Sequence, residues 1–172
     1  MGDLVEALLD VSRITSGRLE LRLEEVELST VAEGAVERWR EAACAADAPL
    51  RVVGAPVRGR WDRLRLEQVL NNLLSNALKY GRGKPIEVRA RVEDDRAVLE
   101  VQDHGIGIAP TDHARIFERW GRAVSAKNYG GLGLGLWIAA QIVAAMRGSI
   151  SVQSAPGQGA TFRVSLPLGE AP

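Results

Sequence analysis

The segment from Leu66 to Tyr80 constrains the fold of this chain more than any other stretch. On a helix that turns by about 100° per residue, its leucines gather on one side at steps of three and four residues. A second side carries Gln68, Asn72, Asn76, Lys79 and Tyr80. Asparagine is a poor residue for a helix interior, and a solvated side usually carries Glu and Lys. The segment therefore predicts a core helix whose amide side is either a polar rim or a binding surface.

Hydrophobic periodicity predicts that helices and strands are interspersed along the chain. We expect helices over residues 3–14, 30–46, 63–80, 111–119 and 134–146. We expect strands over residues 19–28, 50–53, 57–61, 86–92, 98–101, 150–152 and 161–166. Thr30 and Glu33 have the spacing of a capping box, and Asp62 is the expected N-cap of the amide-bearing helix. Because hairpins exclude an all-parallel sheet, the predicted fold class is α/β: a two-layer sandwich in which a mixed, mainly antiparallel sheet packs on three main helices.

Composition excludes several classes of protein. The 22 basic and 22 acidic side chains cancel, so no overall field favours nucleic acid or an anionic membrane surface. The single cysteine, Cys44, excludes an intramolecular disulfide framework and fits a reducing compartment, so we expect a cytoplasmic protein. The uncharged run from Asn128 to Met146 has four glycines in its first half, which predicts a loop leading into a helix and not a membrane span.

Two glycine-rich segments are candidate ligand-binding elements. Asp103 ends a predicted strand and precedes Gly105 and Gly107, so a carboxylate acceptor lies beside backbone that a planar ligand can approach. Residues 130–136, GGLGLGL, open a predicted helix, and bare N–H groups at a helix N-terminus suit phosphate. The chain lacks a P-loop, and these glycines do not follow the first strand as a dinucleotide fingerprint requires. Each segment alone is a weak signal.

Five motifs together carry a specific resemblance. In chain order they are N-x-x-x-N-x-x-K-Y, D-x-G-x-G, I-F-E-R-W, G-G-L-G-L-G-L and G-x-G-A-T-F. Over about Leu28 to Leu168, this order closely resembles the ATP-binding catalytic domain of sensor histidine kinases. That domain belongs to an ATPase group that includes DNA gyrase, the heat-shock chaperone of ninety kilodaltons and the mismatch-repair ATPase. The resemblance implies the Bergerat ATP-binding fold, with ATP and Mg²⁺ as cofactors.

The resemblance implies roles for residues around the phosphates. Asn76 would coordinate Mg²⁺ with Asn72 beside it, while Lys79 and Tyr80 would face the phosphate and sugar region. Arg122 would reach the γ-phosphate, so that the expected catalytic residues are Asn72, Lys79 and Arg122. The lid and its N–H groups would come from Gly131, Leu132, Gly133, Leu134, Gly135 and Leu136.

The resemblance also implies an adenine site. Asp103 would accept a hydrogen bond from the adenine amino group, with Gly105, Gly107 and Ile108 along the base. Thr161 would lie beneath the adenine and support Asp103 through water.

One position separates the kinase branch of this group from its hydrolases. In the gyrase and mismatch-repair branches, the residue four before the metal-binding asparagine is a glutamate that activates water. Here that position is Asn72, and an amide cannot act as a general base. The sequence therefore favours a protein-histidine kinase, which transfers the γ-phosphoryl group to a histidine on a separate domain. The alternatives are a nucleotide-binding regulatory module without kinase activity and an anti-sigma-type serine kinase.

The phosphoacceptor histidine is absent from the sequence. Its two histidines, His104 and His113, both lie inside the catalytic region and are expected to be ordinary polar residues. We expect residues 1–22 to be the C-terminal remnant of a dimerisation and phosphoacceptor helix, and residues 23–172 to be the catalytic domain. The expected partners are ATP, the parent's dimerisation domain and, indirectly, a response regulator. We expect no nucleic acid, no direct membrane contact, a monomer and no self-phosphorylation by this chain alone.

Overall fold

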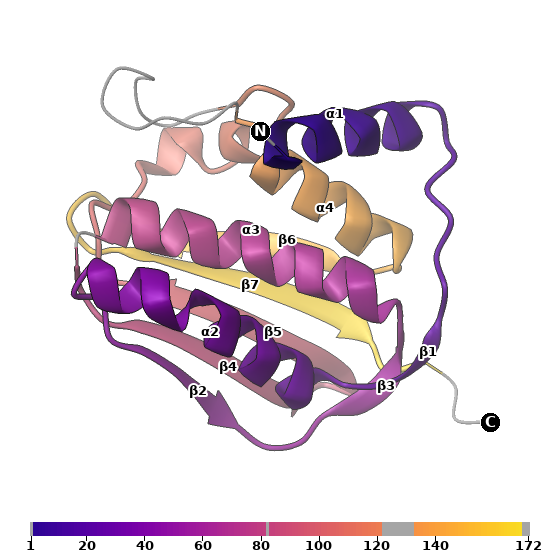
Figure 1. Ribbon diagram of the computed structural model, residues 1–172, viewed down its shortest axis with the longest axis horizontal. Helices are drawn as coiled ribbons and strands as arrows, with labels where there is room; N and C mark the ends of the chain where they lie inside the picture. The colour runs from indigo at the N-terminus through magenta and orange to yellow at the C-terminus, as the bar shows by residue number, and fades with distance from the viewer. Residues whose placement is uncertain (1, 82, 122–132, 170–172) are drawn as a thin grey trace.

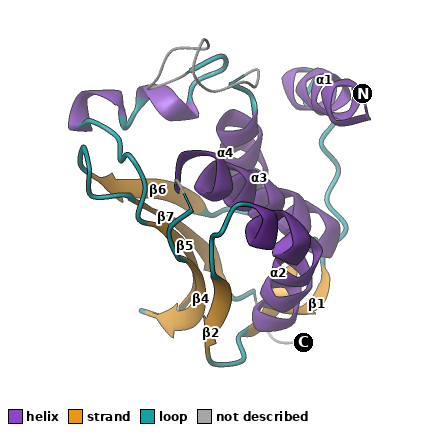
Figure 2. Cartoon of the chain, turned by 60° about the vertical axis from the view of Figure 1, so that its left-hand side comes forward, coloured by secondary structure: helices purple, strands orange, loops and turns teal. Residues whose placement is uncertain are grey.

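The computed structural model describes residues 2–81, 83–121 and 133–169, which form a sheet covered on one face by helices (Figures 1 and 2). Within these residues, the helices are α1 (Gly2–Thr15), α2 (Leu28–Ala45), α3 (Arg63–Gly81) and α4 (Gly135–Ala145). The strands are β1 (Glu24–Glu27), β2 (Leu50–Gly54), β3 (Arg58–Trp61), β4 (Ile86–Glu93), β5 (Arg96–Asp103), β6 (Ser149–Ser154) and β7 (Ala160–Pro167).

The main sheet has the strand order β2-β4-β5-β7-β6. Only β2 and β4 are parallel; the other neighbours in this order are antiparallel. The β4–β5 hairpin turns through Asp94 and Asp95, whose φ angles of +49° and +57° match the tight turn that the strand twist favours. The predicted fold class, a mixed and mainly antiparallel sheet packed on helices, is confirmed.

Helix α3 lies at the centre of the helical layer (Figure 2). Its apolar side is fully buried, and the residues that line it are Leu66, Val69, Leu70, Leu73, Leu74 and Ala77. Asp62 caps the helix as predicted, because its Oδ1 accepts a hydrogen bond from the Arg65 N–H at 3.0 Å. The Trp39 indole on α2 donates to Asn71 Oδ1 at 3.0 Å, which ties the neighbouring helix to α3.

Three local predictions were wrong. The strand expected over residues 19–28 is only the short β1, which pairs with β3 outside the main sheet. The capping box at Thr30 does not form, because α2 begins at Leu28 and the Ser29 and Thr30 hydroxyls bond to the Glu27 carboxylate. The helix expected over residues 111–119 is two separate 3₁₀ turns, Pro110–Asp112 and Arg115–Phe117.

Helix α1 packs against α4 and is joined to α3 by a buried polar cluster. Asp10 is 6% exposed; its Oδ1 accepts from Arg65 Nη1 at 3.0 Å, and its Oδ2 accepts from the Gln68 amide. Arg65 also donates to Gln68 Oε1 at 2.8 Å. Gln68 therefore belongs to the contact with α1, and only the C-terminal part of the amide side of α3 is left for a ligand.

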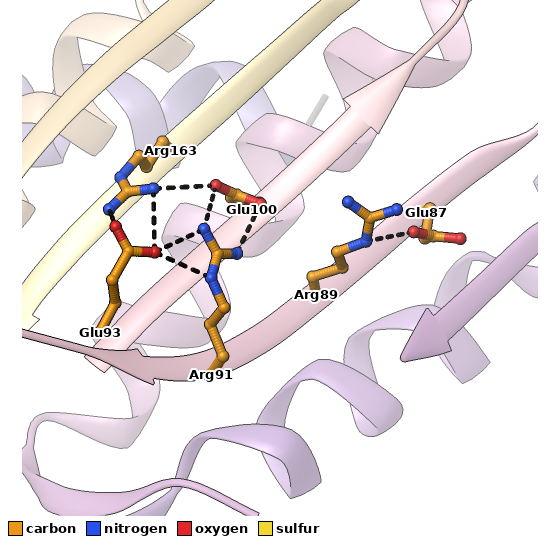
Figure 3. A network of polar contacts seen from close by, with 6 residues as sticks. All are labelled: Glu87, Arg89, Arg91, Glu93, Glu100 and Arg163. Carbon is orange, nitrogen blue, oxygen red and sulfur yellow. Dashed lines mark hydrogen bonds and ion pairs between the residues drawn. The ribbon is translucent and has the colours of Figure 1, made fainter. Parts of the chain in front are cut away.

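The sheet face opposite the helices carries a network of ion pairs (Figure 3). Arg91 binds both Glu100 oxygens, at 2.7 and 2.9 Å, and this bonding holds the pKa of Glu100 below its usual range. Arg163 and Glu93 extend the network across the strands, so these charges satisfy one another on a polar, antiparallel surface. Among the described helices, none is long and apolar enough to cross a membrane.

The contact between Asp10 and Arg65 predicts an energetic coupling between α1 and α3. Removing either residue leaves the other charge poorly compensated, and we expect Asp10→Ala and Arg65→Ala each to lower the free energy of unfolding by roughly 2–4 kcal/mol. The double variant should lose clearly less than the sum, as measured by urea denaturation. The exposed pair Glu37–Arg40 is the control, because solvent screens it and its two substitutions should be additive. Additive losses at Asp10 and Arg65 would contradict the coupling.

Candidate functional site

Two asparagines, Asn72 and Asn76, lie one helical turn apart on α3, and Asn72 lies against the start of α4. Asn72 Nδ2 is buried and has no hydrogen-bond partner in the described chain. A Cβ added to Gly135, the first residue of α4, would lie 3.3 Å from Asn72 Oδ1, so these two segments are in contact. An unpaired buried amide donor costs about 1–3 kcal/mol, and a ligand oxygen would remove that cost. Asn76 follows at half-buried exposure on the same side of α3.

The C-terminal end of α3 touches the loop that follows β5. The Lys79 ammonium lies 4.9 Å from the centre of the Tyr80 ring. The Tyr80 carbonyl oxygen accepts from the Ile106 N–H at 3.2 Å, and a Cβ at Gly105 would lie only 1.9 Å from the same oxygen. Any side chain at position 105 would force the loop away from α3. The structure thereby brings Lys79 and Tyr80 next to the segment that begins at Asp103.

Asp103 ends β5 on the side of the sheet that faces the helices. The residue is 5% exposed, and its Oδ1 accepts from the Gly105 N–H at 2.8 Å. Burial raises the pKa of Asp103, while hydrogen bonds from the Gly105 and Ala160 backbone and the nearby His104 oppose that rise in part. The backbone groups that hold this buried carboxylate are neutral, so it can accept a further hydrogen bond from a ligand.

The loop after Asp103 is closely packed against the turn between β6 and β7. Gly107 has a φ of +71°, and a Cβ there would lie 1.9 Å from the Ala155 carbonyl oxygen. Only glycine satisfies both the left-handed backbone and this contact. The Ile108 N–H is bonded to Ser154 Oγ at 2.8 Å. Gly105, Gly107 and Ile108, all expected near the base, therefore form one continuous and fixed piece of backbone.

The expected position of Thr161 does not agree with the structure. Thr161 pairs with Gln102, whereas Asp103 pairs with Ala160. Because side chains alternate across a strand, Thr161 points to the opposite face of the sheet from Asp103. The alternating exposure along β7 agrees with this, since Ala160 and Phe162 are buried and Thr161 is half-buried. Thr161 cannot lie beneath a base bound at Asp103, and the prediction misplaced it by one residue.

Part of the glycine-rich segment and its arginine fall outside the described residues. Arg122, Gly131 and Leu132 belong to that group, so their predicted roles rest on the sequence alone. Of the remainder, Gly133 has a φ of +71°, Leu134 is buried and precedes α4, and Gly135 and Leu136 form its first turn. Among the described residues, no side chain caps the start of α4, and the N–H groups of its first turn have no partner within the helix, beside Asn72.

Three polar residues bind backbone groups near Asp103 although no role in the site was predicted for them; His104 and His113 were expected to be ordinary polar residues. His104 Nδ1 lies 2.9 Å from the Pro85 carbonyl oxygen, and His113 Nε2 lies 3.2 Å from that of Ile108. A carbonyl only accepts, so each ring nitrogen carries the proton and each histidine tethers backbone on one side of Asp103. The third is Ser154. No pattern in the sequence distinguishes Ser154 from Ser149 and Ser151 on the same strand, because its role depends on contacts distant in sequence.

Taken together, the site offers a buried carboxylate beside fixed backbone, a pair of amides, and a helix N-terminus. The carboxylate and the backbone of residues 105–108 suit a flat base that carries an N–H donor. The amides of Asn72 and Asn76 and the start of α4 suit the oxygens of a phosphate chain. These two halves are joined through the end of α3, at Tyr80.

The comparisons with known proteins agree with this geometry. A family model described as "Histidine kinase-, DNA gyrase B-, and HSP90-like ATPase" matches residues 61–170. The sensor-like histidine kinase SenX3 of Mycobacterium tuberculosis is 37% identical over 172 residues, which cover 97% of this chain and 42% of SenX3. The sensor histidine kinase MtrB of Mycobacterium leprae is 34% identical over 170 residues, which cover 96% of this chain and 30% of MtrB.

Solved structures give the same result. Full-length ShkA in complex with AMPPNP is 30% identical, with a TM-score of 0.89 over 98% of this chain and 36% of ShkA. The mycobacterial sensor histidine kinase MprB is 28% identical, with a TM-score of 0.75 over 87% of this chain and 100% of the MprB chain. This chain spans less than half the length of the curated relatives it matches. On the matched residues, the fold and the arrangement of the site, the chain belongs to the histidine kinase-, DNA gyrase B- and HSP90-like ATPase family.

Proposed function

We propose that this chain is the catalytic domain of a sensor histidine kinase, which binds Mg²⁺·ATP and transfers the γ-phosphoryl group to a histidine on a separate dimerisation domain. The observation that carries the proposal is Asn72, an amide with an unpaired buried donor where a hydrolase of this family would need a glutamate. An amide can hold a phosphate oxygen but cannot take a proton from water. The site therefore favours transfer to a protein acceptor over hydrolysis.

On the base side, Asp103 would accept the hydrogen bond of the adenine amino group. The carboxylate is already fixed by Gly105, and the glycine backbone beside it leaves the approach free of side chains at positions 105 and 107. Guanine presents a carbonyl oxygen at the corresponding position, and two acceptors repel each other. The base side would thereby select adenine nucleotides.

On the phosphate side, Asn76 would supply an amide oxygen to Mg²⁺. Within the described residues, no group of three His, Cys, Asp or Glu side chains could hold a metal ion. That fits Mg²⁺, which keeps several waters and binds through one or two protein oxygens plus substrate phosphates. When bound, the ion would neutralise charge on the phosphates. Lys79, and Arg122 in the segment outside the described residues, would place further positive charge there.

In the transfer step, the bond between the γ-phosphorus and its bridging oxygen breaks, and a bond forms to a nitrogen of the acceptor imidazole. ADP leaves and the imidazole releases its N–H proton. Such a step depends on alignment and charge neutralisation more than on covalent help from the protein. We further propose that α1 is the C-terminal part of the phosphoacceptor domain and that residues 23–172 are the catalytic domain. The packing of α1 on α4 and its link to α3 support a close contact between the two.

The direct test is transfer in trans. We expect this chain, mixed with a histidine-bearing dimerisation domain of the parent and labelled ATP, to place acid-labile, base-stable phosphate on that domain. Asn76→Ala should abolish transfer and Mg²⁺-dependent ATP binding while leaving the thermal midpoint near that of the wild type. A wild-type protein that binds ATP but transfers nothing would favour the regulatory module, and phosphate on serine would favour the serine kinase.

A substitution at Asp103 is expected to have opposite effects on the stability of the protein and on its affinity for ATP. Because burial raises its pKa, ionised Asp103 disfavours folding: its stabilising contribution is present at low pH and is lost as pH rises through the folded pKa. Asp103→Asn should therefore raise the thermal midpoint of the ligand-free protein near pH 7 and lose this advantage in acid. The same variant should weaken ATP binding by roughly 1–3 kcal/mol, because an amide donor would face the adenine amino group.

Scanning calorimetry of both proteins between pH 4 and 8, together with titration calorimetry at pH 7, measures the two effects. The variant Glu100→Gln, on the same strand but on the opposite face and ion-paired, is the control and should lower stability without changing affinity. A midpoint that falls in Asp103→Asn at neutral pH would contradict the assigned environment.

A further inference from the structure

Two segments that are far apart in sequence run side by side at the base side of the site. The loop 104–108 follows β5, and the turn 155–159 joins β6 to β7. The Gly157 N–H donates to the Ile106 carbonyl at 2.7 Å, and the Gly159 N–H donates to the Gly105 carbonyl at 3.2 Å. A Cβ at Gly159, where φ is +72°, would lie 2.1 Å from the Asp103 carbonyl oxygen. The turn therefore supports the backbone on which we place the base.

Ser154 adds a side-chain link between these two segments. Its Oγ accepts from the Ile108 N–H at 2.8 Å and donates to the Gly159 carbonyl at 2.6 Å. Ser154 pairs with Ala160, which in turn pairs with Asp103, so these three residues form one row on the same face of the sheet. The hydroxyl therefore both donates to and accepts from backbone groups beside the Asp103 carboxylate.

The two backbone polar groups of Ile108 are both held by side chains. Ser154 Oγ accepts a hydrogen bond from the Ile108 N–H, and His113 Nε2 lies 3.2 Å from the Ile108 carbonyl oxygen. Ile108 is the last residue of the loop, and the 3₁₀ turn Pro110–Asp112 follows almost at once. Without the hydroxyl, the loop would keep the bonds at Gly105, Ile106 and the Ile108 carbonyl, but the Ile108 N–H would lose its partner.

We propose that Ser154 is a positioning residue of the nucleotide site, which acts through Ile108 to hold the loop 104–108 in the conformation that receives the base. This inference rests on the proposed function. Ser154 itself does not touch the nucleotide; its hydroxyl fixes the backbone that does. The consequence is selective: loss of the hydroxyl weakens binding of the base-bearing ligand and leaves the phosphate side, built from α3 and α4, unchanged.

A purely structural role for Ser154 makes a different prediction. The bond from its hydroxyl to Gly159 lies within the β6–β7 hairpin and would stabilise that hairpin whatever the ligand. In that case Ser154→Ala would lower the thermal midpoint and weaken every ligand to the same extent. The comparison of a ligand with a base and one without it separates the two roles.

The experiment measures dissociation constants for ADP and for inorganic tripolyphosphate with Mg²⁺, the latter by displacement of a fluorescent ATP analogue. We expect Ser154→Ala to raise the dissociation constant of ADP roughly three- to tenfold, as loss of one neutral hydrogen bond does. Its constant for tripolyphosphate should stay within about twofold of the wild type. Ser154→Thr, which keeps the hydroxyl, should restore ADP binding. Ser151→Ala, an exposed serine on the same strand, should match the wild type for both ligands.

Amide hydrogen exchange of the ligand-free protein gives an independent reading. Protection of the Ile108 N–H should fall in Ser154→Ala and persist in Ser154→Thr and Ser151→Ala. Should Ser154→Ala not fold, Ser154→Cys, with a similar volume and a weak donor, takes its place in the same measurements.

The outcomes separate this inference from the function on which it rests. Wild-type protein that binds no ADP overturns the proposed function, and the inference with it. Wild-type binding of ADP, with equal weakening of ADP and tripolyphosphate in Ser154→Ala or with no change in either, overturns the positioning role alone.

Discussion

The apolar side of α3 must be buried, and that requirement fixes the geometry of everything around it. Because its leucines are buried in the core, the rotation of the helix about its axis is fixed. Asn72 therefore lies against the start of α4, and Asn76 lies one turn further along the same side. The same orientation places the Tyr80 carbonyl against Ile106 and Gly105 at the end of β5. One buried helix face therefore positions both the amide pair and the backbone beside Asp103. A shift of α3 along its axis would separate the two halves of the site.

The part of the site that we propose to receive the base is built largely from backbone around Asp103, and this explains its glycines. At residues 105, 107 and 159, the backbone lies very close to a carbonyl oxygen of another segment. Any Cβ at these positions would collide with that oxygen. Close approach of three backbone segments lets N–H and carbonyl groups satisfy one another while Asp103 stays buried. The pKa of Asp103 remains raised by this burial, so the carboxylate has a desolvation cost that a hydrogen bond from a ligand would offset. The cost of burying Asp103 and its capacity to accept a hydrogen bond from a ligand therefore have the same physical origin.

Sequence patterns predicted most of the fold because its elements are locally consistent. The leucine spacing in α3, the Asp62 cap and the alternation in β4 each act within a few residues. Predictions failed where a distant partner decides the outcome. Residues 19–23 form no strand, since only Glu24–Glu27 finds a partner in β3, and Gln68 bonds to Asp10 on α1. Within the candidate site, Asp103 and its glycines could be found as motifs. Thr161 was placed on the wrong face and Ser154 was missed. Strand register and contacts between distant loops cannot be derived from the local sequence.

We propose that Asp103 and the loop after it recognise the amino group of adenine. Titration calorimetry of the wild-type protein with ADP and with inosine diphosphate, in the presence of Mg²⁺, tests it most directly. Inosine differs from adenosine by a carbonyl oxygen in place of the amino group and by a proton on N1, so phosphate and sugar contacts stay equal. We expect ADP to bind at least about tenfold more tightly, because the carbonyl oxygen of inosine would face the buried Asp103 carboxylate as a second acceptor and would repel it. Equal dissociation constants for the two nucleotides would contradict it.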